Sequence, residues 1–95
     1  MKIKQKYCTR GIKNEVPMEL RVVMWELVET IPVVRDYLQI FEVATNTTST
    51  TILHKQEVPK YEATYDIKIT LKEGIKVYVI IDGDGIATMM LNDEY

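Results

Sequence analysis

"PMELRVVMWELVETIP" (residues 17–32) is the stretch that decides the fold, because it is the one strong helical pattern in the sequence. Its apolar residues recur at steps of three and four, which draws a single apolar stripe along a helix. The stripe consists of Leu20, Val23, Met24, Leu27, Val28 and Ile31. Pro17 suits a first helical turn and Pro32 ends the helix. A helix of this length is not stable alone in water, so it must pack against other elements.

The segments around this helix predict strands. KIKQKY (2–7) alternates lysine with other residues, as edge strands often do. RGIKNEVP (10–17) contains Gly11 and Asn14 and predicts a turn. After Pro32 the chain is rich in β-branched and aromatic residues. The predicted strands there are YLQIFEVA (37–44), TTILHKQEVP (50–59), TYDIKITL (64–71), KVYVII (76–81) and IATMML (86–91), with the loop TNTTST (45–50) between the first two.

This order of elements predicts an α+β fold. One helix packs on an antiparallel sheet of five or six strands, and a single domain spans residues 1–95. Large apolar groups occur on both sides of the predicted strands, yet one helix covers only one face of a sheet. The second face must therefore curl on itself, meet a second copy of the chain or receive another protein.

The tetrapeptide DGDG (82–85) is the motif that comes nearest to a metal site. An EF-hand calcium loop counted from Asp82 needs an oxygen ligand at position five and a glycine at position six. The chain has Ile86 and Ala87 at those places. Asp-Gly between two apolar strands instead favours a hairpin turn, because glycine tolerates positive φ. We predict a turn here, and neither a metal nor a cofactor in the chain.

The composition argues against several classes of function. A net charge of -2 gives no reason to expect nucleic acid as a partner. No apolar run approaches the roughly 20 residues that span a bilayer, and the first residues lack the apolar core of a signal peptide. One cysteine forms no internal disulfide and fits a reducing, cytoplasmic setting. One cysteine and one histidine cannot supply the four ligands of a structural zinc site.

The candidate binding surface comes from pairing residues 37–44 with residues 50–59 as a hairpin. If Val43 lies opposite Ile52, the next pairs on the same face bring aromatic and amide side chains together. The predicted patch consists of Tyr37, Gln39, Phe41, His54 and Gln56. The rings would supply buried area and the polar groups would fix the orientation of a partner.

Trp25 is the sixth predicted binding residue. It follows Met24 directly, so it is rotated about 100° from the apolar stripe of the helix. We therefore expect the indole to be partly exposed. An exposed tryptophan is a common anchor of protein interfaces.

Several blocks of the sequence resemble the domain of unknown function 960 family, which comprises small proteins of Gram-positive bacteria and their mobile elements. The blocks are YCTRGI, the segment from Pro17 to Trp25, DYLQIFEV and HKQEVPKY. The matching positions are Thr9, Arg10, Gly11, Trp25, Asp36, Tyr37, Leu38, Gln39, Phe41, His54, Gln56, Glu57, Val58, Pro59 and Tyr61. The resemblance implies no activity. It does not support the last hairpin of the chain.

Two classes of function stay open. The first, which we favour, is a non-enzymatic protein-binding module that acts on another protein or on a second copy of itself. A narrower version is a mobile-element inhibitor of a host defence nuclease such as a CRISPR effector, which the mobile-element association of the family permits. The alternative is a small enzyme with Cys8 as nucleophile and His54 as base.

Overall fold

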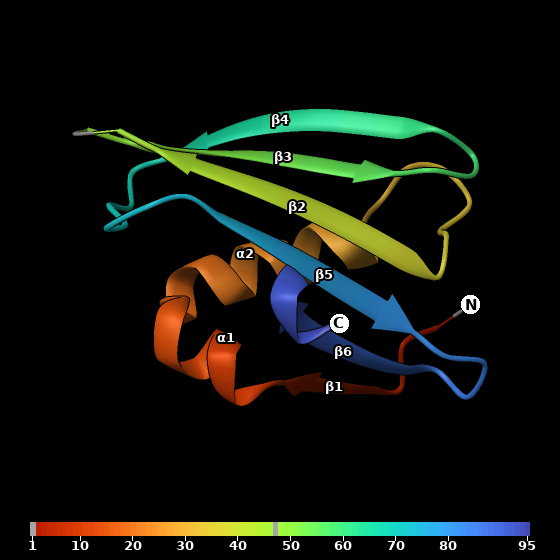
Figure 1. Cartoon of the computed structure of the whole chain (residues 1–95). Coiled ribbons are helices and arrows are strands. Elements are labelled where there is room, and N and C mark those ends of the chain that lie inside the picture. Colours follow the sequence, from red (N-terminus) through yellow and green to blue (C-terminus); the bar gives the residue numbers. More distant parts are fainter. Residues whose placement is uncertain (1, 47) are drawn as a thin grey trace.

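The computed structural model describes residues 2–46 and 48–95 and shows one open six-stranded sheet with two helices on one side (Figure 1). The strand order is β1-β6-β5-β2-β3-β4. The elements are β1 (Gln5–Cys8), α1 (Arg10–Glu15), α2 (Met18–Glu29), β2 (Leu38–Thr45), β3 (Thr50–Gln56), β4 (Tyr61–Ile67), β5 (Ile75–Ile81), β6 (Ile86–Leu91) and a final 3-10 turn η1 (Asn92–Glu94). The α+β class and a sheet of six strands are confirmed.

The strand directions are antiparallel except at one edge. The pairs β2–β3, β3–β4, β2–β5 and β5–β6 are antiparallel, whereas β1 runs parallel to β6 with Gln5 opposite Ile86 and Cys8 opposite Met89. The first and last strands of the chain are therefore neighbours. The lysine-containing segment does lie at an edge of the sheet, as its alternation predicts. The predicted loop 45–50 contains Thr47, which lies outside the described residues.

Two helices replace the one that the sequence predicts. Residues Arg10–Glu15 form α1 where a turn was expected, because Thr9 caps the helix by accepting a hydrogen bond from Ile12 N (3.3 Å). Ile12 is fully buried, so tertiary packing stabilises a segment whose own propensity is poor. The Glu94 carboxylate accepts hydrogen bonds from Thr9 Oγ1 (2.6 Å) and Gly11 N (3.3 Å), which joins η1 to the start of α1.

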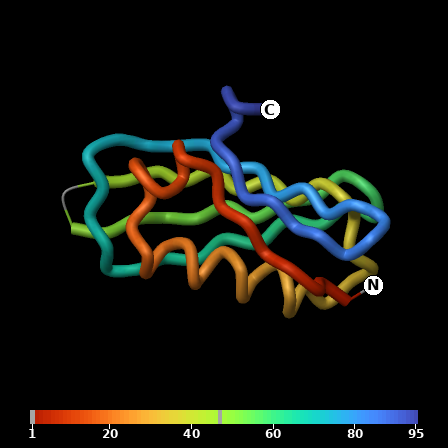
Figure 2. Tube along the Cα trace, turned by 90° about the horizontal axis from the view of Figure 1, so that it is seen from below, coloured from red at the N-terminus to blue at the C-terminus, as the bar shows by residue number. Residues whose placement is uncertain are grey.

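The helix α2 follows its predicted stripe. It buries Leu20, Met24 and Val28 against the sheet and ends at Glu29, two residues before Ile31. The core lies between α2 and the face of the sheet formed by Phe41, Val43, Ile52, Val77, Val79, Ala87 and Met89. Figure 2 shows α2 along one side of the sheet and the C-terminal end of the chain on the other. One sheet face is thus covered by helix and the opposite face is not.

The strand β4 begins and ends earlier in the chain than the sequence predicts. The alternation of residues 64–71 predicted a strand there, but β4 starts three residues earlier and ends at Ile67. Ile69 and Leu71 still pack against the core, so the alternation reflects burial after the strand has ended. Among the described residues, no helix is long and apolar enough to cross a membrane.

The DGDG segment is the hairpin turn between β5 and β6. Asp82 Oδ1 accepts hydrogen bonds from Asp84 N (2.9 Å) and Ile86 N (3.0 Å), and Gly85 has a φ of 83°. The aspartate therefore organises the backbone of the turn. The predicted turn is confirmed, and glycine is required at its last position because L side chains rarely adopt this backbone conformation.

Replacing Gly85 with alanine should lower the free energy of unfolding by about 1–2 kcal/mol. The new Cβ would lie 2.9 Å from Lys2 O, in addition to the strain of positive φ. Gly83→Ala is the matched control in the same turn, because a Cβ there meets nothing within 4 Å. Urea unfolding of both variants checks the prediction, which fails if the two changes have equal effects.

Candidate functional site

The predicted hairpin register between β2 and β3 is confirmed. Val43 lies opposite Ile52, and Phe41 lies opposite His54. Gln39 reaches Gln56 by a side-chain hydrogen bond. The sequence therefore identified a set of side chains that do meet in space.

The face on which they meet is the one that α2 and its flanking loop cover. Phe41 and Gln39 are 0% exposed, His54 is 1% exposed and Gln56 is 3% exposed. The expectation that these four form an exposed docking patch is therefore corrected: in the folded chain they are core residues. Tyr37 alone among the five predicted patch residues is exposed, at 59%.

The buried polar side chains form a hydrogen-bonded network centred on Gln39. Its Nε2 donates to Gln56 Oε1 (2.7 Å) and to Asp36 O (3.0 Å). Gln39 Nε2 donates to both of these acceptors, so the other amide atom, Gln39 Oε1, faces His54 Nε2 at 2.7 Å. Because an amide oxygen only accepts, His54 Nε2 is the donor. Among the described residues, no buried side-chain nitrogen or oxygen lacks a hydrogen-bond partner. The network is therefore compatible with complete burial.

The imidazole of His54 lies between two aromatic rings. It stacks on Phe41 with centroids 4.5 Å apart and an angle of 12°, and it meets Tyr61 edge-on at 5.6 Å. Burial lowers the pKa of His54 from 6.5 to about 4. The ring is therefore neutral near pH 7 and acts as a packed hydrogen-bond donor.

At the surface, the same network holds two loops in place. Gln56 Nε2 donates to Val34 O (2.9 Å) and to Pro59 O (2.8 Å). The Asp36 carboxylate accepts from Tyr37 N (2.8 Å) through one oxygen and from Val58 N (3.2 Å) through the other. The α2–β2 loop and the β3–β4 turn are therefore bound to the same two side chains.

These two loops display apolar side chains to solvent. Val34 is 79% exposed, Tyr37 is 59% exposed and Val58 is 73% exposed. We call these three residues the loop cluster. Glu57 precedes Val58 directly and is exposed, so a carboxylate adjoins the loop cluster along the chain. Sequence reasoning found Tyr37 but missed both valines, because a loop residue has no periodicity to reveal which way it points.

Trp25 lies on α2, where it packs against the margin of the core beside Lys6 of β1. It is half-buried, as its helical position predicts, and Lys6 Nζ lies 6.0 Å from the centroid of its ring. Lys6 also pairs with Glu29 near the end of the helix. Trp25 and Tyr37 therefore do not belong to one surface patch built by the β2–β3 hairpin.

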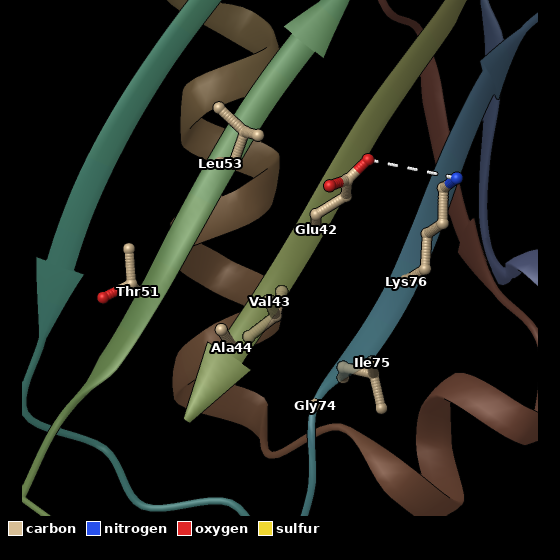
Figure 3. A pocket seen from close by; sticks show the side chains of 8 residues that line it. All are labelled: Glu42, Val43, Ala44, Thr51, Leu53, Gly74, Ile75 and Lys76. Carbon is tan, nitrogen blue, oxygen red and sulfur yellow. Dashed lines mark ion pairs between the residues drawn. The ribbon is translucent and has the colours of Figure 1, made fainter. Parts of the chain in front are cut away.

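The uncovered face of the sheet carries a shallow open depression of about 600 Å³ (Figure 3). Its lining residues are Glu42, Val43, Ala44, Thr51, Leu53, Gly74, Ile75 and Lys76. Glu42 pairs with Lys55 (2.6 Å) and with Lys76 (3.9 Å). The Lys55 hydrogen bond lowers the pKa of Glu42. These ion pairs neutralise the charges across neighbouring strands. The depression therefore presents few charged groups that could bind a ligand.

The enzymatic pair of the alternative hypothesis does not form. Cys8 lies on β1 and His54 on β3, with β6, β5 and β2 between them. Four inter-strand steps of about 4.8 Å place the two residues on the order of 20 Å apart. The Cys8–His54 alternative is therefore wrong as a nucleophile–base pair within one chain. Within residues 2–46 and 48–95, no three His, Cys, Asp or Glu side chains are grouped to hold a metal ion.

Comparison with known proteins gives a family and a fold. The family model described as "Staphylococcal protein of unknown function (DUF960)" matches residues 5–94. A crystal structure of a protein of unknown function from Enterococcus faecalis superposes with a TM-score of 0.82 at 18% identity, covering 97% of this chain and 91% of that chain. At that identity the likeness concerns the fold. No curated protein matches the sequence.

Proposed function

Because the chain belongs to the DUF960 family of staphylococcal proteins of unknown function, we propose its function from its own geometry: it is a non-enzymatic protein-binding module that uses the loop cluster. The observation that carries the proposal is the way Asp36 and Gln56 hold two loops so that Val34, Tyr37 and Val58 stay exposed. Exposed apolar residues on a fixed backbone bind without a large loss of conformational entropy.

The chemistry of the cluster favours one kind of partner. One exposed aromatic ring and two exposed valines on neighbouring loops suit an apolar segment of another protein. The exposed carboxylate of Glu57, next to Val58 in the chain, suits lysine or arginine beside that segment. We therefore propose a partner protein that presents apolar side chains flanked by basic ones. Exposed β-branched side chains also lose little rotamer freedom when they are buried in a complex.

Val34→Asp and Val58→Asp should each weaken partner binding at least about tenfold while leaving folding nearly unchanged, because both side chains are exposed. Proteins of the native host retained by the immobilised chain but lost with both variants would be identified by mass spectrometry. The affinity of each purified candidate would then be measured by calorimetry. Val22→Asp is the control, because Val22 is 55% exposed on α2, away from the cluster.

A candidate that binds all three variants equally would contradict the proposal. A candidate that binds the chain only when Val22 is intact would place the interface on α2, beside Trp25. The narrower idea of an inhibitor of a host defence nuclease stays a prediction, and a nuclease among the retained proteins would support it.

A further inference from the structure

The two edge strands of the sheet, β1 and β4, differ in how readily another strand could pair with them. The β1 edge is four residues long and contains Lys6, with Lys4 just before it. The β4 edge is seven residues long, pairs regularly with β3 along its whole length and contains no proline or lysine itself, although Lys60 lies just before it and Lys68 just after it. Short, lysine-bearing edges resist the addition of a strand, whereas long regular ones favour it.

The side chains of β4 on the helix side are incompletely covered. Tyr61, Ala63, Tyr65 and Ile67 are half-buried, whereas the four residues on the same face of β3 are buried: Thr50, Ile52, His54 and Gln56. In Figure 1, β4 is the outermost strand and no element lies beyond it. A further strand at this edge would cover the exposed sides of these rings.

We propose that the occupant of this edge is a second copy of the chain, whose β4 pairs antiparallel with the first across a two-fold axis at Ala63. In this register Tyr61 lies opposite the partner's Tyr65, and Lys60, the residue just before β4, comes opposite the partner's Asp66. Each pair occurs twice because of the symmetry. Opposite charges and aromatic rings are the cross-strand pairs that stabilise a sheet.

The charges on β4 favour this register over the one whose two-fold axis lies one residue further along the strand. An axis at Thr64 would place Glu62 opposite the partner's Asp66 twice, which brings like charges together. The axis at Ala63 instead places Glu62 opposite the partner's Thr64. The result is a continuous twelve-stranded sheet with both α2 helices on one face. One added strand buries less than the roughly 1,200 Å² of a stable interface, so the dimer dissociates at low concentration.

Charge exchange tests the contact. Sedimentation equilibrium at concentrations up to the millimolar range should show reversible dimers. Asp66→Lys should raise the dimer dissociation constant about tenfold or more, because it places two lysines opposite each other twice. The double variant Lys60→Glu/Asp66→Lys should restore wild-type association. Asp84→Lys is the control with the same change of charge, because Asp84 is exposed in the β5–β6 turn, away from β4.

Cysteine placement tests the register. With Cys8 changed to serine, oxidation of Ala63→Cys should give a disulfide-linked dimer, because residues opposite each other on the axis are about 5 Å apart. Thr64→Cys and Tyr65→Cys should cross-link less, and preferential cross-linking at either would overturn the register. A chain that stays monomeric throughout, with folding of each variant verified by circular dichroism, would overturn the proposal.

Discussion

Replacing Phe41 with alanine is expected to lower the free energy of unfolding by about 3–5 kcal/mol. The ring is fully buried in the core and stacks on His54 at 4.5 Å. Truncation removes this contact and leaves a cavity that the rigid β2–β3 pair cannot collapse to fill. The fold itself depends on Phe41, so the variant should be partly unfolded near room temperature if the chain has the ordinary stability of a small domain.

Denaturant unfolding of Phe41→Ala beside Tyr37→Ala gives the decisive comparison. The two aromatic residues were predicted to share one surface, but Tyr37 is 59% exposed. Its truncation should therefore change stability by less than about 1 kcal/mol while weakening partner binding. Similar stability losses in the two variants would show that Phe41 is less buried in solution than in the structure.

The free energy of unfolding should fall by about 3 kcal/mol between pH 6.5 and pH 4 because of His54 alone. The pKa of His54 falls from 6.5 to about 4 on folding, and each pKa unit corresponds to about 1.4 kcal/mol. Between these two values the unfolded chain binds the proton and the folded chain does not. The free energy of unfolding therefore falls as the pH falls from 6.5 to 4, and His54 adds no further loss below pH 4.

His54→Gln isolates this contribution, because glutamine keeps a hydrogen-bond donor near Gln39 but does not titrate. The variant should be less stable near pH 7, since it loses the stack on Phe41, but its stability should change little from pH 6.5 to pH 5. An unchanged pH dependence in the variant would assign the effect to other groups. Titration of the His54 ring by NMR, with a midpoint near its ordinary value of 6.5, would contradict the prediction directly.

The β2–β3 hairpin shows how far sequence reasoning reaches. The predicted patch depended on a condition, that Val43 lies opposite Ile52, and the structure has that pair. A slip of one residue would have exchanged the partners across the hairpin. Which face the helix covers did not follow, because Leu38, Ile40 and Leu53 make the opposite face apolar as well. Amides at Gln39 and Gln56 suggested solvent, yet hydrogen bonds between them allow burial.

Other features depend on contacts that no local pattern records. Segment α1 has six residues and includes Gly11 and Asn14, so its propensity argues against a helix. It forms because Ile12 reaches the core and Thr9 caps its start. The loop cluster is similar. Val34 O accepts a hydrogen bond from Gln56 and Val58 N donates one to Asp36, and each of these partners is distant in sequence from the valine that it holds.

The parallel pairing of β1 with β6 has a consequence for the order of folding. The strands that meet are the first and the last, so their ladder closes a loop that includes nearly all of the described chain. Closing so large a loop is entropically unfavourable until the intervening hairpins have formed, and nonlocal pairs slow folding in general. A chain still emerging from the ribosome can build the β2–β3–β4 meander, but β1 must wait until β6 has been synthesised before it joins the sheet.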